Sequence, residues 1–514
     1  MGSTCINGLV VARENEHANA PQLHNKAAPK SQGNDDDIPV RRLSSQWDAL
    51  QEAERRQSDN TLPLPNTTKE YDDESTEVAS AMSMYSSVKG DISSLGDEVP
   101  YMLQSLEHRD VCVHSTEKLS DYSILAKVDV GRKKAFVDCA RQSEVLDRAM
   151  GSMCGMGVGD AMGHMFEFLP AQDKPGRSYF SLKSFKFYGE QNTFGLQYGQ
   201  WTDDASMGLC MADSLILRKD YDGGDMRSRF WCWWHKGYNN AFRLDRSRMR
   251  SGSVGLGGNI SKSLDDMSKL PRGIKPDPIY NARGEDAGNG SLMRFTPIAL
   301  FFHDAPDLDL YDYARKSSYT THPGIVAAEA CSFLAHLIKS ALHRKSGRLD
   351  VKRFLEEASE VYMQTSGLQN KSGWGYDEMK WLVSGHPTRD TERCWRWRDE
   401  SLDVAATLRA RGDRYNGYPV SAGYFGSYSL DGLAMALWAV YHTTSFNEAI
   451  EKSINLCGDA DSHGSIAGQI AGALYGYSTI HEKFLKWLNR WDEHEFAVRA
   501  VLLHELGSQW ADRR

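Results

Sequence analysis

Two groups of acidic and hydroxyl side chains stand far apart in this chain. One is the segment 458–462, GDADS, and the other is 199–205, GQWTDDA. Both are followed by apolar residues at helical spacing, so each group is predicted to begin a helix. Hard divalent cations prefer clusters of oxygen ligands of this kind. Asp and Ser are also common helix N-caps where no metal is present, so either group alone leaves a purely structural role open.

A third acidic segment, 159–167 (GDAMGHMFE), adds one more carboxylate at the end of a predicted helix. Glycines recur at every fourth position both in 151–163, before this carboxylate, and in 464–476, after the GDADS group. Such rows let two helix backbones approach closely, and we expect these helices to pack against each other. Five carboxylates and two hydroxyls are then sufficient for a two-metal site. The candidate ligands are Glu167, Thr202, Asp203, Asp204, Asp459, Asp461 and Ser462.

The order of these motifs resembles the ADP-ribosylhydrolase (ADP-ribosylglycohydrolase) family, in particular its dinitrogenase-reductase-activating glycohydrolase type. The motifs are GDxxGxxxE, WTDD, GNGxxMR, TH, GDxDSxxxxAG and GALYG, between Arg148 and Ile480. The resemblance implies an all-α fold with a binuclear Mg²⁺ or Mn²⁺ centre. It also implies hydrolysis of the bond between ADP-ribose and an acceptor, either a protein side chain or a small molecule. Ala205 departs from the family pattern, which usually has Thr at this position.

One of two candidate ligands is expected to orient the attacking water. Two Mg²⁺ ions would bind the ribose hydroxyls and a water, and Glu167 or Asp204 would orient that water. The sequence does not choose between these two carboxylates. An alternative is a catalytically degenerate module that binds ADP-ribose without turnover, and a further one is a structural metal site in a scaffold protein.

Two further segments are predicted to bind the nucleotide part of the substrate. The glycine-rich loop 288–291 precedes an apolar helix expected near Leu292, and amide groups at a helix start can bind a pyrophosphate. An aromatic loop around residue 424 could stack on adenine or ribose, although a place in the core is equally compatible with it. The predicted substrate-binding residues are Gly288, Asn289, Gly290, Ser291, Tyr424 and Phe425. Arg294 is expected to form a structural ion pair, and His322 to support the site without binding metal, because hard cations prefer oxygen.

The elements that position these groups are predicted to form a compact orthogonal helical domain over residues 145–514, with no strand pattern of sustained alternation. Residues 116–144 form a transitional linker or helix. Residues 1–115 are polar and lack a core-forming pattern, which predicts a disordered tail.

Composition limits the other classes of function. The net charge of −9 argues against a broad basic surface for nucleic acid. The sequence has no run of about 18 apolar residues, so no membrane span is expected. Nine scattered cysteines favour free thiols and a cytoplasmic protein. A lipid anchor at Gly2 and Cys5 is weakly indicated, because Ile6 replaces the usual Ser or Thr of a myristoylation signal.

Overall fold

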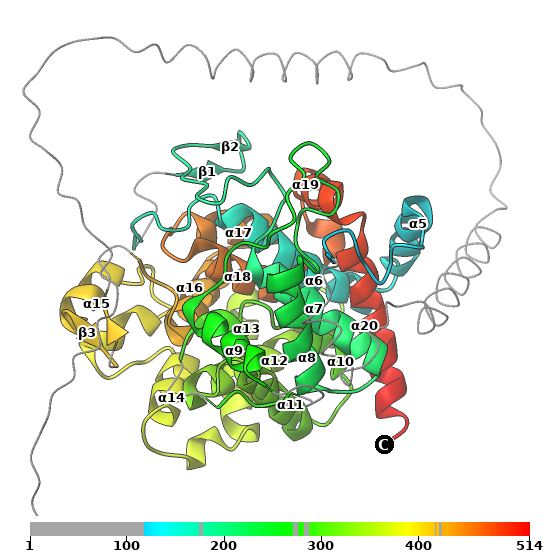
Figure 1. Cartoon of the computed structure of the whole chain (residues 1–514). Helices are drawn as coiled ribbons and strands as arrows, with labels where there is room; N and C mark the ends of the chain where they lie inside the picture. Colours follow the sequence, from blue (N-terminus) through cyan, green and yellow to red (C-terminus); the bar gives the residue numbers. More distant parts are fainter. Residues whose placement is uncertain (1–117, 174–177, 271–275, 282–286, 417, 421–423) are drawn as a thin grey trace, which may run out of the picture. The chain divides into compact units, whose positions relative to one another are not determined.

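The computed structural model describes residues 118–173, 178–270, 276–281, 287–416, 418–420 and 424–514, all within one compact unit (Figure 1). The predicted tail, residues 1–115 with the possible anchor at its start, lies outside the described residues. The boundaries proposed from the sequence for this tail therefore stay predictions.

The described chain is mostly helical, with very little strand, which confirms the all-α prediction. In chain order, its first half contains α5 (Val130–Ala140), α6 (Glu144–Gly163), α7 (Asp203–Arg218), α8 (Gly223–Lys236), α9 (Gly258–Ser268), the 3-10 helix η3 (Asn289–Ser291), α10 (Thr296–Phe301), α11 (Asp307–Tyr319) and α12 (Ile325–Leu342). The second half contains α13 (Val351–Thr365), η4 (Leu368–Asn370), α14 (Tyr376–Ser384), η5 (Asp390–Trp395), α15 (Val404–Arg411), α16 (Ser429–Tyr441), α17 (Phe446–Ile454), α18 (Ala460–Tyr475), η6 (Tyr477–Thr479), α19 (Glu482–Asp492) and α20 (Glu495–Ala511).

Strands are confined to two short antiparallel hairpins in the described part of the chain. β1 (Phe180–Ser181) pairs with β2 (Lys186–Phe187), and β3 (Arg414–Tyr415) pairs with β4 (Tyr418–Pro419). Each hairpin lies in a connection between helices, so neither changes the fold class.

The two glycine rows pack directly against each other, as the sequence predicts. A Cβ atom added at Gly155 would lie 2.1 Å from the carbonyl oxygen of Gly468, and one at Gly159 would lie 2.1 Å from that of Gly464. The same pairing joins Gly151 to Gly472. Helix α6 therefore runs antiparallel to α18 at a distance that only glycine permits at these positions. We call these contacts the glycine interface.

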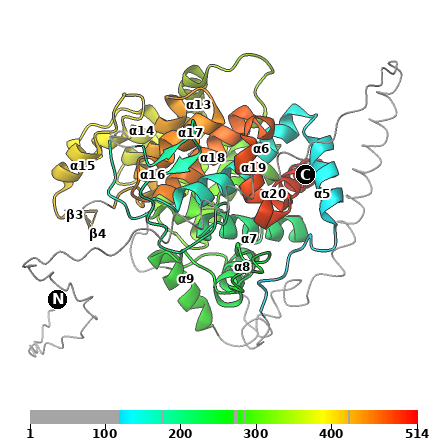
Figure 2. The ribbon, with the colours of Figure 1, turned by 90° about the horizontal axis from the view of Figure 1, so that it is seen from above.

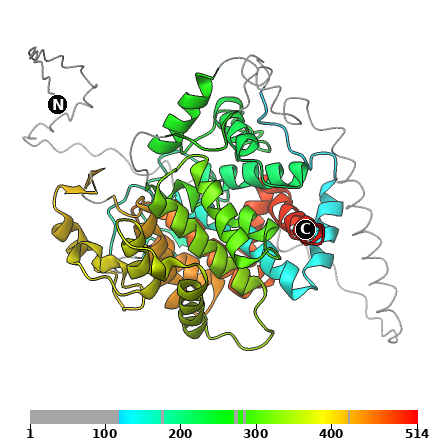
Figure 3. The same ribbon diagram turned by 90° about the horizontal axis from the view of Figure 1, so that it is seen from below.

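Other helices surround this central pair. Helices α12, α16 and α17 pack against α18, and α20 packs against α6. Figures 1 and 2 place α15 on one side of the pair and α20 on the other, and Figure 3 shows α5 beside α20. The result is a helical core built on the glycine interface.

The segment that precedes α6 belongs to the same core. Leu119, Leu125 and Phe136 are buried in the hydrophobic cluster that contains α6 and α20. Lys133 is also buried and pairs with Glu495 of α20 at 2.7 Å. Residues 118–140, which the sequence suggested as transitional, thus contribute directly to the packing of the unit.

Helix α12 is the one helix among the described residues that is long and apolar enough to cross a membrane, a feature that the sequence analysis did not single out. Of this helix, 83% is buried inside the protein. Its composition is that of a core helix, and it packs on α11, α13, α14 and α18.

Candidate active site

The ends of α6 and α18 meet because the glycine interface sets them antiparallel. Glu167 follows the end of α6, and Asp459 immediately precedes α18. Two backbone hydrogen bonds join the segments: the Phe168 N–H donates to the carbonyl of Gly458 (3.0 Å), and the Gly458 N–H donates to that of Leu169 (2.9 Å). Carboxylate oxygens of Glu167, Asp459 and Asp461 consequently lie within 4.8 Å of one another.

Asp160, near the C-terminal end of α6, forms hydrogen bonds with the start of α7. Its carboxylate accepts hydrogen bonds from the Thr202 amide (2.8 Å), the Thr202 hydroxyl (2.9 Å) and the Ala205 amide (2.9 Å). Sequence reasoning quoted Asp160 within its motif but did not place it in the site. The departure at Ala205 leaves this contact intact, because Ala205 takes part through its backbone.

The start of α7 brings the remaining predicted acids to the same place. The Thr202 hydroxyl lies 3.3 Å from Asp204 Oδ2 and 3.5 Å from Asp461 Oδ2. Asp203 lines the adjoining cavity, whereas Asp204 is 1% exposed and lies behind it. At Gly255, whose φ is +90°, an added Cβ would lie 2.4 Å from Asp203 Oδ1. The loop before α9 therefore also borders the site, a role that the sequence analysis did not assign to it.

The N-cap explanation of these acids does not hold in the structure. Asp459 and Thr202 occupy the N-cap positions of α18 and α7, but neither side chain accepts a capping hydrogen bond. Asp459 Oδ2 instead accepts from the Asn289 side-chain amide at 2.8 Å, and the Tyr424 hydroxyl also hydrogen-bonds Asp459. Ser462 differs from the other predicted ligands, because its hydroxyl lies 3.6 Å from the Met293 sulfur.

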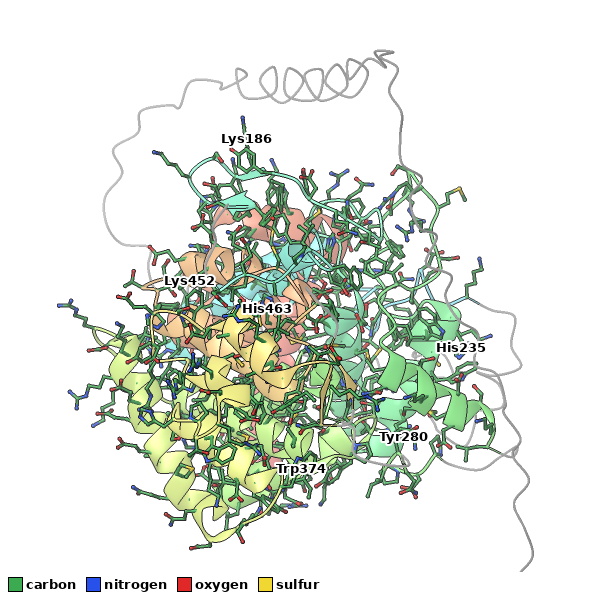
Figure 4. The ribbon with its side chains drawn as sticks, turned by 90° about the vertical axis from the view of Figure 1, so that its left-hand side faces the viewer. Lys186, His235, Tyr280, Trp374, Lys452 and His463 are labelled. Carbon is green, nitrogen blue, oxygen red and sulfur yellow. The ribbon has the colours of Figure 1, made fainter. Side chains whose placement is uncertain are left out.

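His463, which follows the predicted ligands in α18, is structural. One ring nitrogen lies 2.9 Å from the Ser453 hydroxyl and the other 2.8 Å from the carbonyl oxygen of Cys457. Figure 4 shows it in the interior of the unit. Burial lowers its pKa to about 4, so the ring is neutral. Both ring nitrogens are in use, and an oxygen-only ligand set remains.

The carboxylates are buried without a compensating cation. Among the described residues none of the five makes an ion pair with Lys or Arg. Burial and repulsion from its neighbours raise the pKa of Asp459 to about 7 and that of Asp461 to about 6. Burial, followed by Asp461 and Asp459, raises the pKa of Glu167 strongly, and burial raises those of Asp203 and Asp204. Such clustering is costly unless cations offset it.

Two buried oxygen atoms support a fit to divalent cations. Glu167 Oε2 and Asp204 Oδ1 have no hydrogen-bond partner in the described part of the protein. Together with the Thr202 hydroxyl, the five carboxylates form an all-oxygen donor set, the chemistry that Mg²⁺ and Mn²⁺ prefer. The residues present therefore fit hard divalent ions.

A cavity of about 670 Å³ opens next to the acids. Glu167, Asp203, Asp459, Asp461 and Ser462 line it, together with the loop 287–290, whose Asn289 contacts Asp459. A drug-sized ligand occupies a pocket of about 300–1,000 Å³, so a nucleotide-sized substrate fits this volume.

The glycine-rich loop differs in detail from its prediction. A 3-10 helix of three residues forms at 289–291, and the helix expected near Leu292 begins only at Thr296. The Asn289 N–H donates to the carbonyl of Ser427 at 2.9 Å and is not free for a phosphate. Ser291 faces the core, where its hydroxyl accepts from that of Ser318 at 2.9 Å. Gly288, Asn289 and Gly290 line the cavity, whereas Ser291 does not.

Comparison with known proteins identifies the architecture that holds this site. The family model described as ADP-ribosylglycohydrolase matches residues 141–512. The chain belongs to the ADP-ribosylglycohydrolase family. It is therefore a hydrolase of the class that removes ADP-ribose.

Individual relatives within the family are distant. An ADP-ribosylarginine hydrolase, Tri1, of Pseudomonas putida is 27% identical over 68% of this chain and 76% of its own length. The ADP-ribosyl-[dinitrogen reductase] glycohydrolase of Rhodospirillum rubrum is 24% identical over 68% of this chain and 93% of its own. A solved structure, an ADP-ribosylglycohydrolase-related protein complex, is 25% identical, covers 71% of this chain and 99% of its own, and has a TM-score of 0.46. The family prediction is confirmed, but the dinitrogenase-reductase type is not favoured over the arginine hydrolases.

His322 packs against the glycine-rich loop 288–290. A Cβ added at Gly290 would lie 2.7 Å from the His322 ring, and one at Gly288 would lie 3.2 Å from it. The glycines thus make room for the imidazole beneath the loop. Its Nδ1 lies 2.7 Å from the Thr321 hydroxyl. Burial and Arg294 lower the pKa of His322 to about 3, so it stays neutral.

The ion pair predicted for Arg294 is wrong for the described residues. Its guanidinium donates to the hydroxyls of Thr321 (2.6 Å) and Thr320 (3.2 Å) and stacks over Phe230 with 4.5 Å to the ring centroid. Fully buried, it finds hydroxyl and aromatic partners in place of a carboxylate.

The two predicted aromatic residues of the ADP-ribosylglycohydrolase cavity are placed differently from each other. Phe425 is 3% exposed, and its carbonyl accepts from the Asp459 amide at 2.9 Å. Tyr424 is half-buried and stacks on Phe168 with centroids 5.5 Å apart. Phe168 is 44% exposed and lines the cavity, yet nothing in its sequence context singled it out. Phe168 and Tyr424 therefore form a stacked aromatic pair at the cavity, whereas Phe425 is buried beside them.

Proposed function

We propose that this protein hydrolyses the glycosidic bond between ADP-ribose and an acceptor at the buried acidic site. Two divalent cations, Mg²⁺ or alternatively Mn²⁺, would be held there. The proposed ligands are Glu167, Thr202, Asp203, Asp204, Asp459 and Asp461, with Ser462 at the margin. The observation that carries the proposal is the convergence of five buried carboxylates from three helix ends, four of which line a nucleotide-sized cavity and none of which pairs with Lys or Arg in the described part of the chain.

When bound, the cations would supply Lewis-acid orientation of ribose hydroxyls and of a water. The protein's own residues would do the rest. Glu167 lines the cavity and Asp204 does not, so we favour Glu167 for accepting a proton from the attacking water. Asp204 lies behind the cavity and would act as a ligand only. Asn289 and Tyr424 would keep Asp459 in its orientation through their hydrogen bonds.

We propose arginine as the first acceptor to test. Support comes from the name of the Pseudomonas relative, an ADP-ribosylarginine hydrolase. The arginine could belong to a protein or to a small ADP-ribose conjugate.

The test is incubation of the full chain with arginine-linked and serine-linked ADP-ribosyl peptides in Mg²⁺, with free ADP-ribose measured by chromatography. We expect release from the arginine conjugate, and loss of release in a chelator. Glu167→Gln should lower kcat by about 10²-fold or more, whereas Asp309→Asn, at an exposed position of α11, should have no effect. Binding of ADP-ribose without any release would favour the binding-only alternative. Activity that survives chelation would contradict the cation-dependent proposal.

We also propose that the protein works in a reducing compartment such as the cytoplasm. The seven described cysteines are free, and all but Cys139 are buried, which supports this location. Fractionation of cells that express the full chain tests it, since recovery in an oxidising compartment would contradict the proposal.

A further inference from the structure

A cluster of histidines lies where α10 and α12 end against α20. His303 and Asp304 follow the end of α10, and His343 is the C-cap residue of α12. His504 and Ser508, one turn apart on α20, contact them from the other side. None of these residues borders the acidic cavity, and the hydrolysis proposed above does not use them.

Three ligand-type atoms of the cluster face one another. His303 Nδ1 lies 3.3 Å from His343 Nε2 and 3.2 Å from Asp304 Oδ1, and the third side, His343 Nε2 to Asp304 Oδ1, measures 3.8 Å. Ligands at about 2.0–2.1 Å around a tetrahedral zinc are separated by about 3.3 Å. The three distances thus outline one face of a tetrahedron without any movement of the backbone.

The outer atoms of these side chains are held in the way that metal ligands usually are. His303 Nε2 lies 3.1 Å from the carbonyl oxygen of His504, so it carries the hydrogen and leaves Nδ1 with a lone pair. The His504 ring stacks on His303 with centroids 3.9 Å apart. Asp304 Oδ2 accepts from the Ser508 hydroxyl at 2.8 Å, which leaves Oδ1 toward the imidazoles.

The electrostatic setting also suits a cation. The C-terminal ends of α10 and α12 direct their partial negative charge at the cluster. The ammonium group of Lys339 is paired with Asp307 and with the carbonyl of Ala305, at 2.7 Å each. His343 and Asp304 are 43% and 38% exposed, so an ion has access from solvent and a fourth position remains for water.

We propose that His303, Asp304 and His343 bind one Zn²⁺ ion, at a site separate from the acidic one. Two imidazoles and a carboxylate are a donor set suited to zinc and less suited to Mg²⁺. The ion would tie the ends of α10 and α12 together where α20 covers them. A bare hydrogen bond between His343 and His303 accounts for one of the three distances, but it does not account for Asp304 Oδ1 facing both rings.

The test is titration of the full chain with zinc chloride by calorimetry in excess Mg²⁺, which occupies the oxygen-only site. Wild type is compared with His343→Ala and Asp304→Asn, two changes at exposed positions, and with His386→Ala, an exposed histidine outside the cluster. We expect one bound Zn²⁺ per chain in wild type and in His386→Ala. Affinity should fall at least about tenfold in the other two variants, since each loses one of three ligands. Zinc should also raise Tm in wild type and not in His343→Ala.

X-ray absorption of the zinc-loaded wild type keeps the result independent of any variant. Two imidazole ligands are expected, whereas the ligand set proposed for the acidic site consists of oxygen atoms alone. Zinc binding that is equal in wild type and His343→Ala, or a zinc spectrum without imidazole, would overturn the proposal. The absence of zinc binding at 100 µM would also overturn the proposal; a Kd of this size corresponds to a binding free energy of roughly −5.5 kcal/mol.

Discussion

The glycine interface gives a sharp test, because two glycines of α6 only two residues apart differ in what they contact. Gly155 faces the backbone of α18, and an added Cβ would lie 2.1 Å from the carbonyl oxygen of Gly468. At Gly157 the added Cβ would lie 3.0 Å from the ring of Phe496, a side chain that can shift. We therefore compare Gly155→Ala with Gly157→Ala.

The structure sets the size of the effect. Real Cβ atoms are essentially never found within 3.0 Å of another atom, so α6 and α18 must separate by about 0.9 Å in Gly155→Ala. Overpacking of this kind costs about 1–3 kcal/mol. The higher helix propensity of alanine stabilises a helix by only about 0.5–1 kcal/mol relative to glycine. Gly155→Ala should lower the free energy of unfolding by roughly 1–2 kcal/mol, whereas Gly157→Ala should leave it nearly unchanged.

Activity should respond more strongly than stability. Glu167 follows α6 and Asp461 lies in α18, so a wider interface moves carboxylates of the two helices apart. A misplacement of about 1 Å can cost about 10²-fold in rate. We would measure kcat/KM for release of ADP-ribose, with urea unfolding in parallel. Wild-type activity and stability in Gly155→Ala would refute the inference that glycine is required at this crossing.

Three further predictions concern the acids, their titration and the N-terminal boundary. Asp461→Ala should abolish release of ADP-ribose and weaken Mg²⁺ binding in calorimetry, with the circular dichroism spectrum retained; full activity would contradict a role as ligand. In EDTA, the Tm of the protein should fall as pH rises from about 5 to 7.5. Asp459 and Asp461 have pKa values raised to about 7 and about 6, so the folded state binds protons more tightly than the unfolded chain does. Deprotonation of the two carboxyl groups removes this stabilisation of the folded state. Added Mg²⁺ or Asp459→Asn should flatten that decline, and an unchanged slope would count against the raised values. A chain that begins at Lys118 should fold and release ADP-ribose, but a chain that begins at Glu144 should unfold at a lower temperature. The shorter chain lacks the buried Phe136 and leaves Glu495 without its partner Lys133. Equal Tm values for the two chains would place 118–143 outside the core.

The sequence predicted the central helix pair because its signal is local and repetitive. Glycine at every fourth position has few explanations other than a close helix crossing, and the structure confirms the pairing of Gly155 with Gly468. The acids at the ends of that pair follow directly from it. The same reasoning gave the start of α7, since two adjacent carboxylates precede an apolar helical run at Asp203.

Other parts of the site depend on contacts that no local pattern records. Asp160 acts on backbone groups more than forty residues later in the chain, and Gly255 approaches Asp203 from a loop with a weak motif. The direction in which Ser291 points was also not readable, because a short 3-10 helix replaces the expected helix start. The pairing of His303 with His343 requires α10 and α12 to end side by side.

The close crossing of α6 and α18 also means that different parts of the molecule differ in how well they tolerate substitutions. The carboxylates sit at the ends of two helices whose spacing is fixed, whereas Phe168, Tyr424 and the loop before α9 line the cavity from connecting segments. Side chains of these segments can therefore change while the helix pair is kept, provided that Tyr424 and Gly255, which contact Asp459 and Asp203, are retained. The helix pair is the part that must be inherited unchanged, and the connections are the part in which new specificities can arise.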